Sequence, residues 1–175
     1  MIVETTRLVD RWLRHPEYGV AAMLTLVPRS IPGGGEDPIP ETPIIYNDTE
    51  HEEVAAEIDP PGKRSLVLFI DSELDTDARD KHRQIATGLQ VVVAYISKEV
   101  PPLVAVREGG YVLRAVRMSL TRYNSQDLSA GYREVNGVKI ASVNNMTQQR
   151  VAGAVGRSQL WGFVLAAVTV IDSIP

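Results

Sequence analysis

Four acidic residues alternate along one charged segment, as the oxygen ligands of a calcium-binding loop do. This acidic row consists of Asp71, Glu73, Asp75 and Asp77. A calcium loop needs glycine at its sixth position and a carboxylate that binds through both oxygens at its twelfth. Those positions hold Thr76 and His82. We therefore interpret residues 71–83 as a solvated loop, or as an acidic patch that faces a partner.

The three histidines, His15, His51 and His82, show no metal-ligand spacing. His51 is followed by two glutamates, which suggests acid–base chemistry. However, Ala55 stands where a zinc-protease motif requires its second histidine. We expect surface histidines, and we predict that the protein needs no metal or cofactor.

Glycine and serine motifs give no stronger sign of catalysis. Gly33–Gly35 and Gly153–Gly156 lack the GxGxxG spacing and the Lys-Ser/Thr pair of a phosphate-binding loop. Leu128–Gly131 lacks the first glycine of a nucleophile elbow, and no predicted strand leads directly into it. The sequence predicts no catalytic residue, so we do not expect an enzyme. An enzyme of unrecognised type is the alternative from a different functional class.

An amphipathic helix is predicted over residues 107–124, because large apolar residues recur there at spacings of three and four. Three arginines, Arg107, Arg114 and Arg117, fall together on a different side of it. Such a face is typical of a solvated or partner-binding surface, with a subunit interface and phosphate contact as further alternatives. We predict that these arginines meet the acidic row of a neighbouring copy, in a contact that closes into a ring.

Charge is distributed unevenly along the 175 residues, whose net charge is −4. Residues 1–104 carry a net −8 and residues 105–175 a net +4. Nucleic-acid binding by the whole surface is disfavoured, because phosphate contact needs a basic excess. The two halves either mix their charges on one folded surface or favour head-to-tail contact between identical copies.

Length and an apolar content of 44% predict a single domain over residues 1–175. The absence of cysteine excludes a disulfide framework and a thiolate metal site. The N-terminus lacks the features of a signal peptide, and the longest apolar stretch, 160–171, is too short to cross a bilayer as a helix. We expect a soluble protein with no membrane partner.

Residues 30–62 predict an extended acidic arm or long loop. They contain no Lys or Arg, nine acidic residues, and proline or glycine at ten positions. Such a segment buries little apolar surface. We expect this arm and loop 71–83 to be mobile in the isolated subunit and to become ordered beside a partner. Within the arm, residues 43–46 and 54–58 look able to pair as strands, and 59–62 supply a turn.

The remaining patterns predict an α+β fold with a mostly antiparallel sheet flanked by helices and long loop or arm insertions. Helices are expected over residues 4–14 and 17–27, and strands over residues 65–71, 84–97 and 160–171. We expect these strands to lie in one central sheet, with helix 107–124 on one face of it.

The dipeptide Asn136-Gly137 is a strong signal for a two-residue hairpin turn. It would join residues 132–135 to residues 138–141. The polar stretch 144–158 is expected to be a loop or a hairpin arm.

In this order of elements the chain resembles the tail-terminator (tail-completion) proteins of long-tailed bacteriophages. The likeness covers nearly the whole chain but contains no signature motif. It is carried by PIIY at 43–46, SLVLFID at 65–71, QIATGLQVVVAYIS at 84–97, YVLRAVRMSLTRY at 111–123, VNGVKIASVNN at 135–145 and LWGFVLAAVTVID at 160–172.

The resemblance implies a structural virion protein without catalytic residues, assembled in the host cytoplasm and located in the neck region of the tail. Members of the family form a six-membered ring that caps the tail tube and presents a surface to the neck. The implied partners are further copies of the chain, the major tail tube protein and a head-completion protein, with DNA passing through the ring without specific binding. A head-completion or head–tail connector protein is the nearest alternative.

Overall fold

A computed structural model describes residues 2–47, 63–79, 84–123, 137–152 and 158–173. Its elements are α1 (Ile2–Leu13), α2 (Val20–Leu26), β1 (Ile44–Asn47), β2 (Ser65–Arg79), β3 (Gln84–Ile96), α4 (Pro102–Thr121), β4 (Gly137–Ala152) and β5 (Ser158–Ser173). The predicted strand 54–58, the turn 59–62 and the strand 132–135 with its turn residue Asn136 lie outside the described residues, as do His51, His82 and the motifs at 128–131 and 153–156.

The strands form one five-stranded sheet in the order β1-β2-β3-β5-β4. β1 runs parallel to β2, and the other neighbouring strands are antiparallel. This confirms the predicted α+β fold with a mostly antiparallel sheet. It also confirms that residues 65–71, 84–97 and 160–171 lie together, because β2, β3 and β5 are consecutive neighbours.

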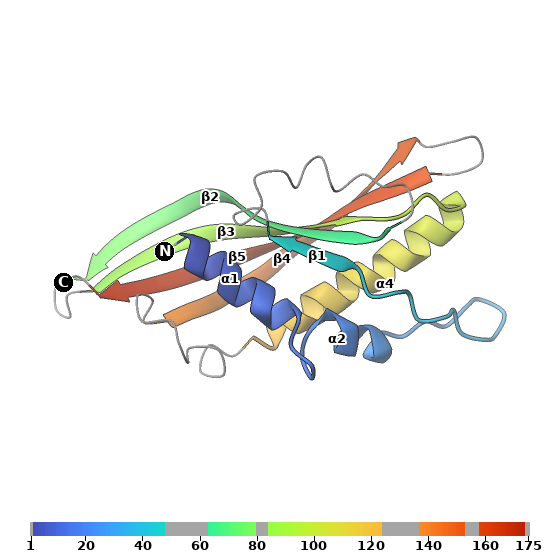
Figure 1. Ribbon diagram of the computed structural model, residues 1–175, viewed down its shortest axis with the longest axis horizontal. Helices are drawn as coiled ribbons and strands as arrows, with labels where there is room; N and C mark the ends of the chain where they lie inside the picture. Colours follow the sequence, from blue (N-terminus) through green and yellow to red (C-terminus); the bar gives the residue numbers. More distant parts are fainter. Residues whose placement is uncertain (1, 48–62, 80–83, 124–136, 153–157, 174–175) are drawn as a thin grey trace.

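The described helices cover one face of the sheet (Figure 1). On β3 that face carries Leu89, Val91, Val93 and Tyr95, all fully buried, as the alternation of large apolar residues predicts. α4 crosses β5 and β4, while α1 lies over β1 and β2. The helix predicted at 107–124 therefore packs as expected, although it begins earlier, at Pro102, where proline fits the first helical turn.

The opposite face of the sheet holds a second, smaller apolar cluster. It is formed by Val67, Ala94 and Ile96, with Tyr46, Phe69 and Phe163 packed against them. On β5 the large residue Phe163 thus lies on the side away from the helices, and the smaller Val164, Ala166 and Val168 face them. Small side chains there leave room for α4 to approach the sheet closely.

Gly162 is where α4 comes nearest to β5. A methyl group added at Gly162 would lie 2.5 Å from Cδ1 of the fully buried Leu113. Real Cβ atoms do not come so close to another carbon, because that distance is well inside van der Waals contact. Glycine at this position therefore sets the separation between helix and sheet.

The end of α1 is joined to α4 by Trp12. Its indole Nε1–H donates a 2.8 Å hydrogen bond to the carbonyl oxygen of Ser119, 107 residues away in sequence. The indole ring stacks on Tyr18, with ring centroids 5.5 Å apart, and meets the edge of Tyr123 at 5.3 Å. The predicted apolar side of helix 4–14 is thereby confirmed as a core contact.

The prediction of a loop over residues 71–83 is wrong as far as Arg79. β2 continues to Arg79 and pairs with β3 along that length, with register shifts between Ile70 and Ser72 and between Glu73 and Asp75. The main-chain hydrogen bonds offered by the long β3 override the low strand propensity of acidic residues. The two bulges absorb the irregularity.

The prediction of a loop over residues 144–158 is also wrong as far as Ala152. β4 runs from Gly137 to Ala152 and pairs with β5 along its length, with register shifts after Ile140 and after Asn144. Polar residues such as Asn144 and Gln148 carry no strand signal of their own. They are held in the sheet by the apolar strand β5 beside them.

Candidate functional site: a strap along helix α4

The described first part of the predicted acidic arm forms a strap, residues 30–43, between α2 and β1. It begins with a tight turn in which Gly33, Gly34 and Gly35 have φ of 98°, 104° and 100°. Only glycine adopts such angles readily. An isolated bridge between Ser30 and Glu36 closes the turn. The strap therefore folds back toward α4.

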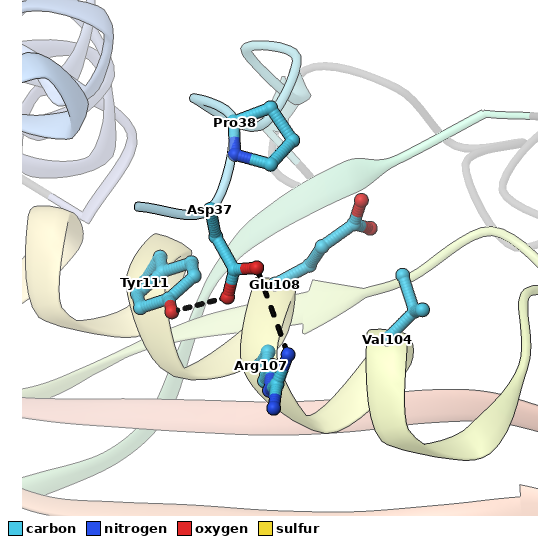
Figure 2. A pocket seen from close by; sticks show the side chains of 6 residues that line it. All are labelled: Asp37, Pro38, Val104, Arg107, Glu108 and Tyr111. Atoms are coloured by element: carbon cyan, nitrogen blue, oxygen red, sulfur yellow. Dashed lines mark hydrogen bonds and ion pairs between the residues drawn. The ribbon is translucent and has the colours of Figure 1, made fainter. Parts of the chain in front are cut away.

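Asp37 fastens the strap to α4. Its Oδ2 accepts a 2.7 Å hydrogen bond from the hydroxyl of Tyr111, and its Oδ1 lies 3.6 Å from Nη1 of Arg107 (Figure 2). Its backbone is held as well, because Arg29 Nη1 donates to the Asp37 carbonyl oxygen at 2.6 Å. Donation to the carboxylate favours the neutral phenol and raises the pKa of Tyr111.

A second fastening lies deeper, where Arg64 at the start of β2 meets α4. Its Nη2 and Nε donate to the two carboxylate oxygens of Glu108 at 2.6 and 3.1 Å, and Nη1 donates to Glu41 of the strap at 2.6 Å. The Arg64 side chain is only 6% exposed, whereas that of Glu41 is 78% exposed. Burial disfavours the charged guanidinium, but the bond and charge of Glu108 outweigh it and raise the pKa of Arg64.

Tyr95 lies beneath this ion network. Burial raises the pKa of its phenol well above the usual value, and the nearby positive charge of Arg64 only partly offsets this. Its hydroxyl makes no hydrogen bond of ordinary geometry within the described part of the chain. The phenol is therefore protonated at neutral pH, and its burial without such a bond costs stability.

A shallow cavity of about 170 Å³ lies between the strap and α4. It is lined by Asp37, Pro38, Val104, Arg107, Glu108 and Tyr111 (Figure 2). Large apolar side chains stand exposed on the first turns of α4 and on the strap, with Leu103 63% and Ile39 50% exposed. The charged groups of the cavity already pair with one another or with Arg64. The polar groups of the cavity are thus engaged within the subunit, and apolar groups are exposed beside them.

The predicted interface residues lie in different parts of the structure, the arginines on α4 and the acidic row on β2. Arg107 forms an ion pair with Asp37 of its own strap. Arg114 and Arg117 are exposed, and neither forms an ion pair with another residue in the described ranges. Within one subunit, α4 and the far end of β2 lie at different parts of the sheet (Figure 1).

The acidic row does not form one continuous edge of alternating residues. Asp71 is exposed. In the ladder with β3, Glu73 lies across from Leu89, whereas Asp75 and Asp77 lie across from Gly88 and Ala86. The bulge between Glu73 and Asp75 therefore breaks the alternation on which a single row depends.

The chain matches no known protein-family model, and a comparison with curated proteins found no match. Within the described ranges, no helix is both long and apolar enough to cross a membrane. In the same ranges, no three histidine or carboxylate side chains come together in a way that would hold a metal ion.

Sequence reasoning missed Asp37, Tyr111 and the Arg64–Glu108 pair. One signal was present, because Arg107, Tyr111 and Arg114 recur at spacings of four and three and so share a side of the helix. An arm without basic residues and a helix with exposed arginines are also complementary in charge. What the pattern did not indicate is that both belong to one chain's own packing.

Proposed function

We propose that this chain is a structural virion protein of a long-tailed bacteriophage, which caps the tail tube as a ring and joins the tail to the head. The observation that carries the proposal is the form of the sheet. Its described helices lie on one face, and long strands form both lateral sides except where the short β1 covers Ser65–Leu68 of β2. A subunit of this form adds to identical neighbours on either side.

The described surface supports a binding role rather than catalysis. The polar groups of the cavity beside the strap are engaged within the subunit, because the Tyr111 hydroxyl donates to Asp37 and Glu108 is bound by Arg64. Exposed Leu103, Ile39 and Val104 offer apolar contact area beside it. Such groups suit a protein partner.

In this proposal the ring is a hexamer that caps the tail tube, and its partners are the major tail tube protein and a head-completion protein. Arg114 and Arg117 are the exposed part of the basic face and meet an acidic partner surface. DNA passes through the ring without specific binding, and no metal or cofactor takes part. The protein resides in the neck region of the virion after assembly in the host cytoplasm.

A head-completion or head–tail connector protein would use the same kind of subunit. Binding to purified tail tubes, compared with binding to portal-bearing heads, separates the two functions. The alternative that the chain is a small enzyme is tested by thermal stabilisation with a panel of metabolites. The proposed function predicts that no metabolite raises the melting temperature.

A further inference from the structure

The two lateral sides of the sheet carry main chain that no described strand pairs with. β4 is an edge strand of 16 residues, and no described strand pairs with its outer side. On the other side β1 covers only Ser65–Leu68 of β2, so that residues 69–79 of β2 have no described partner on their outer side. Neither stretch contains proline, which would blunt such an edge.

We propose that the outer edge of β4 in one copy pairs with residues 69–79 of β2 in the next copy. The occupant of each edge is thus a second copy of this chain, and the contact is head-to-tail. The proposal rests on the ring assembly of the proposed function and names the surface that builds it.

Strand direction fits this pairing. Along the order β2-β3-β5-β4 each pair is antiparallel, so β4 runs opposite to β2. A neighbour with its sheet in the same orientation therefore brings its β2 antiparallel to β4, which continues the alternation across the boundary. The same contact repeats at every boundary and closes when the rotation completes a circle.

The two edges carry opposite charge. β4 contains Lys139 and Arg150 and no acidic residue. Residues 69–79 of β2 contain the acidic row and one base, Arg79. Opposite charges on neighbouring strands stabilise a pair, and like charges destabilise it. Pairing of either edge with its own copy would bring like charges together.

The register of the sheet places the charges at the same height. Asp75 pairs with Gly88, Gly88 with Thr169, and Thr169 with Lys139. Asp75 and Lys139 therefore lie on one line across the sheet, at its opposite edges. A neighbour without axial shift brings the two positions side by side. The tilt that ring closure requires moves the register by a few residues.

Both edge strands also bend over the same part of the sheet. β2 has register shifts across from Val91–Gly88 of β3, and those of β4 fall across from Val168–Val164 of β5. These two stretches pair with each other within Gly88–Val93. Because bulges bend a strand, edges that bend at one height follow a similar curve.

Cysteine cross-linking tests the contact, and the natural chain contains no cysteine. The variant Lys139→Cys is mixed in turn with Asp71→Cys, Asp75→Cys and Asp77→Cys under mild oxidation, with circular dichroism as the check on folding. We expect a disulfide-linked dimer in at least one mixture and none with either variant alone. Directly opposite residues of antiparallel strands have Cα atoms about 4.5–5.5 Å apart, within the range that a disulfide bridges. The double variant of the best pair is expected to give a ladder of linked oligomers.

Three outcomes would overturn the proposal. A dimer from Lys139→Cys alone would mean that β4 pairs with itself. A dimer from Asp75→Cys mixed with Arg117→Cys, in place of Lys139→Cys, would assign the acidic row to the helix face. No dimer in any mixture at high protein concentration would mean that these edges do not meet.

This readout is independent of tail binding because no tail tube is present. A chain that cross-links through its edges but does not bind tail tubes keeps this contact and loses the tail function. A chain that binds tubes without cross-linking keeps the tail function and loses this contact.

Discussion

Tyr111 and Asp37 are separated by 74 residues, yet the tyrosine hydroxyl lies 2.7 Å from the aspartate Oδ2 and ties the strap to helix α4. With Arg107 and the backbone bond from Arg29, this contact holds the middle of a segment whose composition predicts mobility. The strap is an acidic segment, and its Asp37 pairs with basic residues of the same subunit.

Loss of this contact should release the strap. We expect Asp37→Ala to speed amide exchange of residues 36–41 about tenfold, because a hydrogen bond to a charged group is lost together with an ion pair. Tyr111→Phe should have a smaller effect in the same direction. Asp71→Ala removes an exposed carboxylate elsewhere and is the control. Unchanged exchange in Asp37→Ala would show that other contacts hold the strap.

Arg64 should matter more to stability than its exposed partner does. Arg64→Ala leaves Glu108 without its bidentate partner, and we expect a loss of roughly 2 kcal/mol in the free energy of unfolding, less than for a fully buried pair because Glu108 keeps some solvent contact. Glu41→Ala should cost less than about 0.5 kcal/mol, since Glu41 is mostly exposed. Urea denaturation of both variants decides this, and equal losses would contradict it.

Buried tyrosines should make the fold sensitive to alkali. Burial raises the pKa of Tyr123 to about 12, and that of Tyr95 also lies above its value of about 10 in the unfolded chain. Between these values the unfolded chain releases protons that the folded chain retains. The stability that these two tyrosines contribute is therefore fully present below about pH 10 and is lost as pH rises through the folded pKa values.

Tyr95→Phe should reduce this alkaline loss. Because the hydroxyl of Tyr95 has no ordinary hydrogen bond to another described residue, its removal should leave stability at pH 8 unchanged or slightly higher. Melting curves at pH 8 and pH 11 measure the change in stability at pH 8 and the size of the alkaline loss. A marked loss at pH 8 would mean that the hydroxyl makes a stabilising contact.

Gly162 should not accept even a methyl group without cost. Gly162→Ala is expected to destabilise the protein by about 1–3 kcal/mol, because Leu113 must move out of a filled position. In a Leu113→Ala background the same change should cost much less, since the clashing atoms are gone. A double-mutant cycle in urea measures this coupling. Additive effects would mean that α4 and β5 have room to separate.

Charge reversal at Arg114 and Arg117 tests the proposal that these exposed arginines of α4 contact an acidic partner surface. The double variant Arg114→Glu and Arg117→Glu should weaken partner binding in a salt-sensitive way and leave tails overlong or unjoined to heads, without unfolding the subunit. Arg11→Glu places a similar change on α1 and is the control. Normal tail length and joining in the double variant would remove these arginines from the interface.

Much of the core was predictable because its signal is local. Val91, Val93 and Tyr95 alternate in a run that only a sheet buried on its helix side explains, and Leu113, Val116 and Leu120 recur at helical spacing. The acidic end of β2 and the polar β4 were not predictable in this way. Their strand conformation comes from pairing with β3 and β5 beside them. Such main-chain pairing does not require particular residue types, so it cannot be recognised from the sequence of the paired strand.

The candidate site was predictable only in part, for a related reason. Arg107 was identified from its helix face, but its partner Asp37 lies in a segment whose composition indicates a free arm. Long-range pairing of Arg64 with Glu108 follows from the fold and not from spacing in the chain. Ion pairs of this kind become visible only when the elements that carry them have been placed.

Binding to tail tubes tests the central claim most directly. The proposed function assigns this chain to a long-tailed phage. Uncapped tail tubes of that phage are mixed with the purified protein and imaged by electron microscopy, with tube length measured during continued polymerisation. The proposed function predicts ring-shaped density at one end of each tube and an arrest of growth. Tubes that stay bare and keep growing, while the protein binds portal-bearing heads or neither structure, would contradict it.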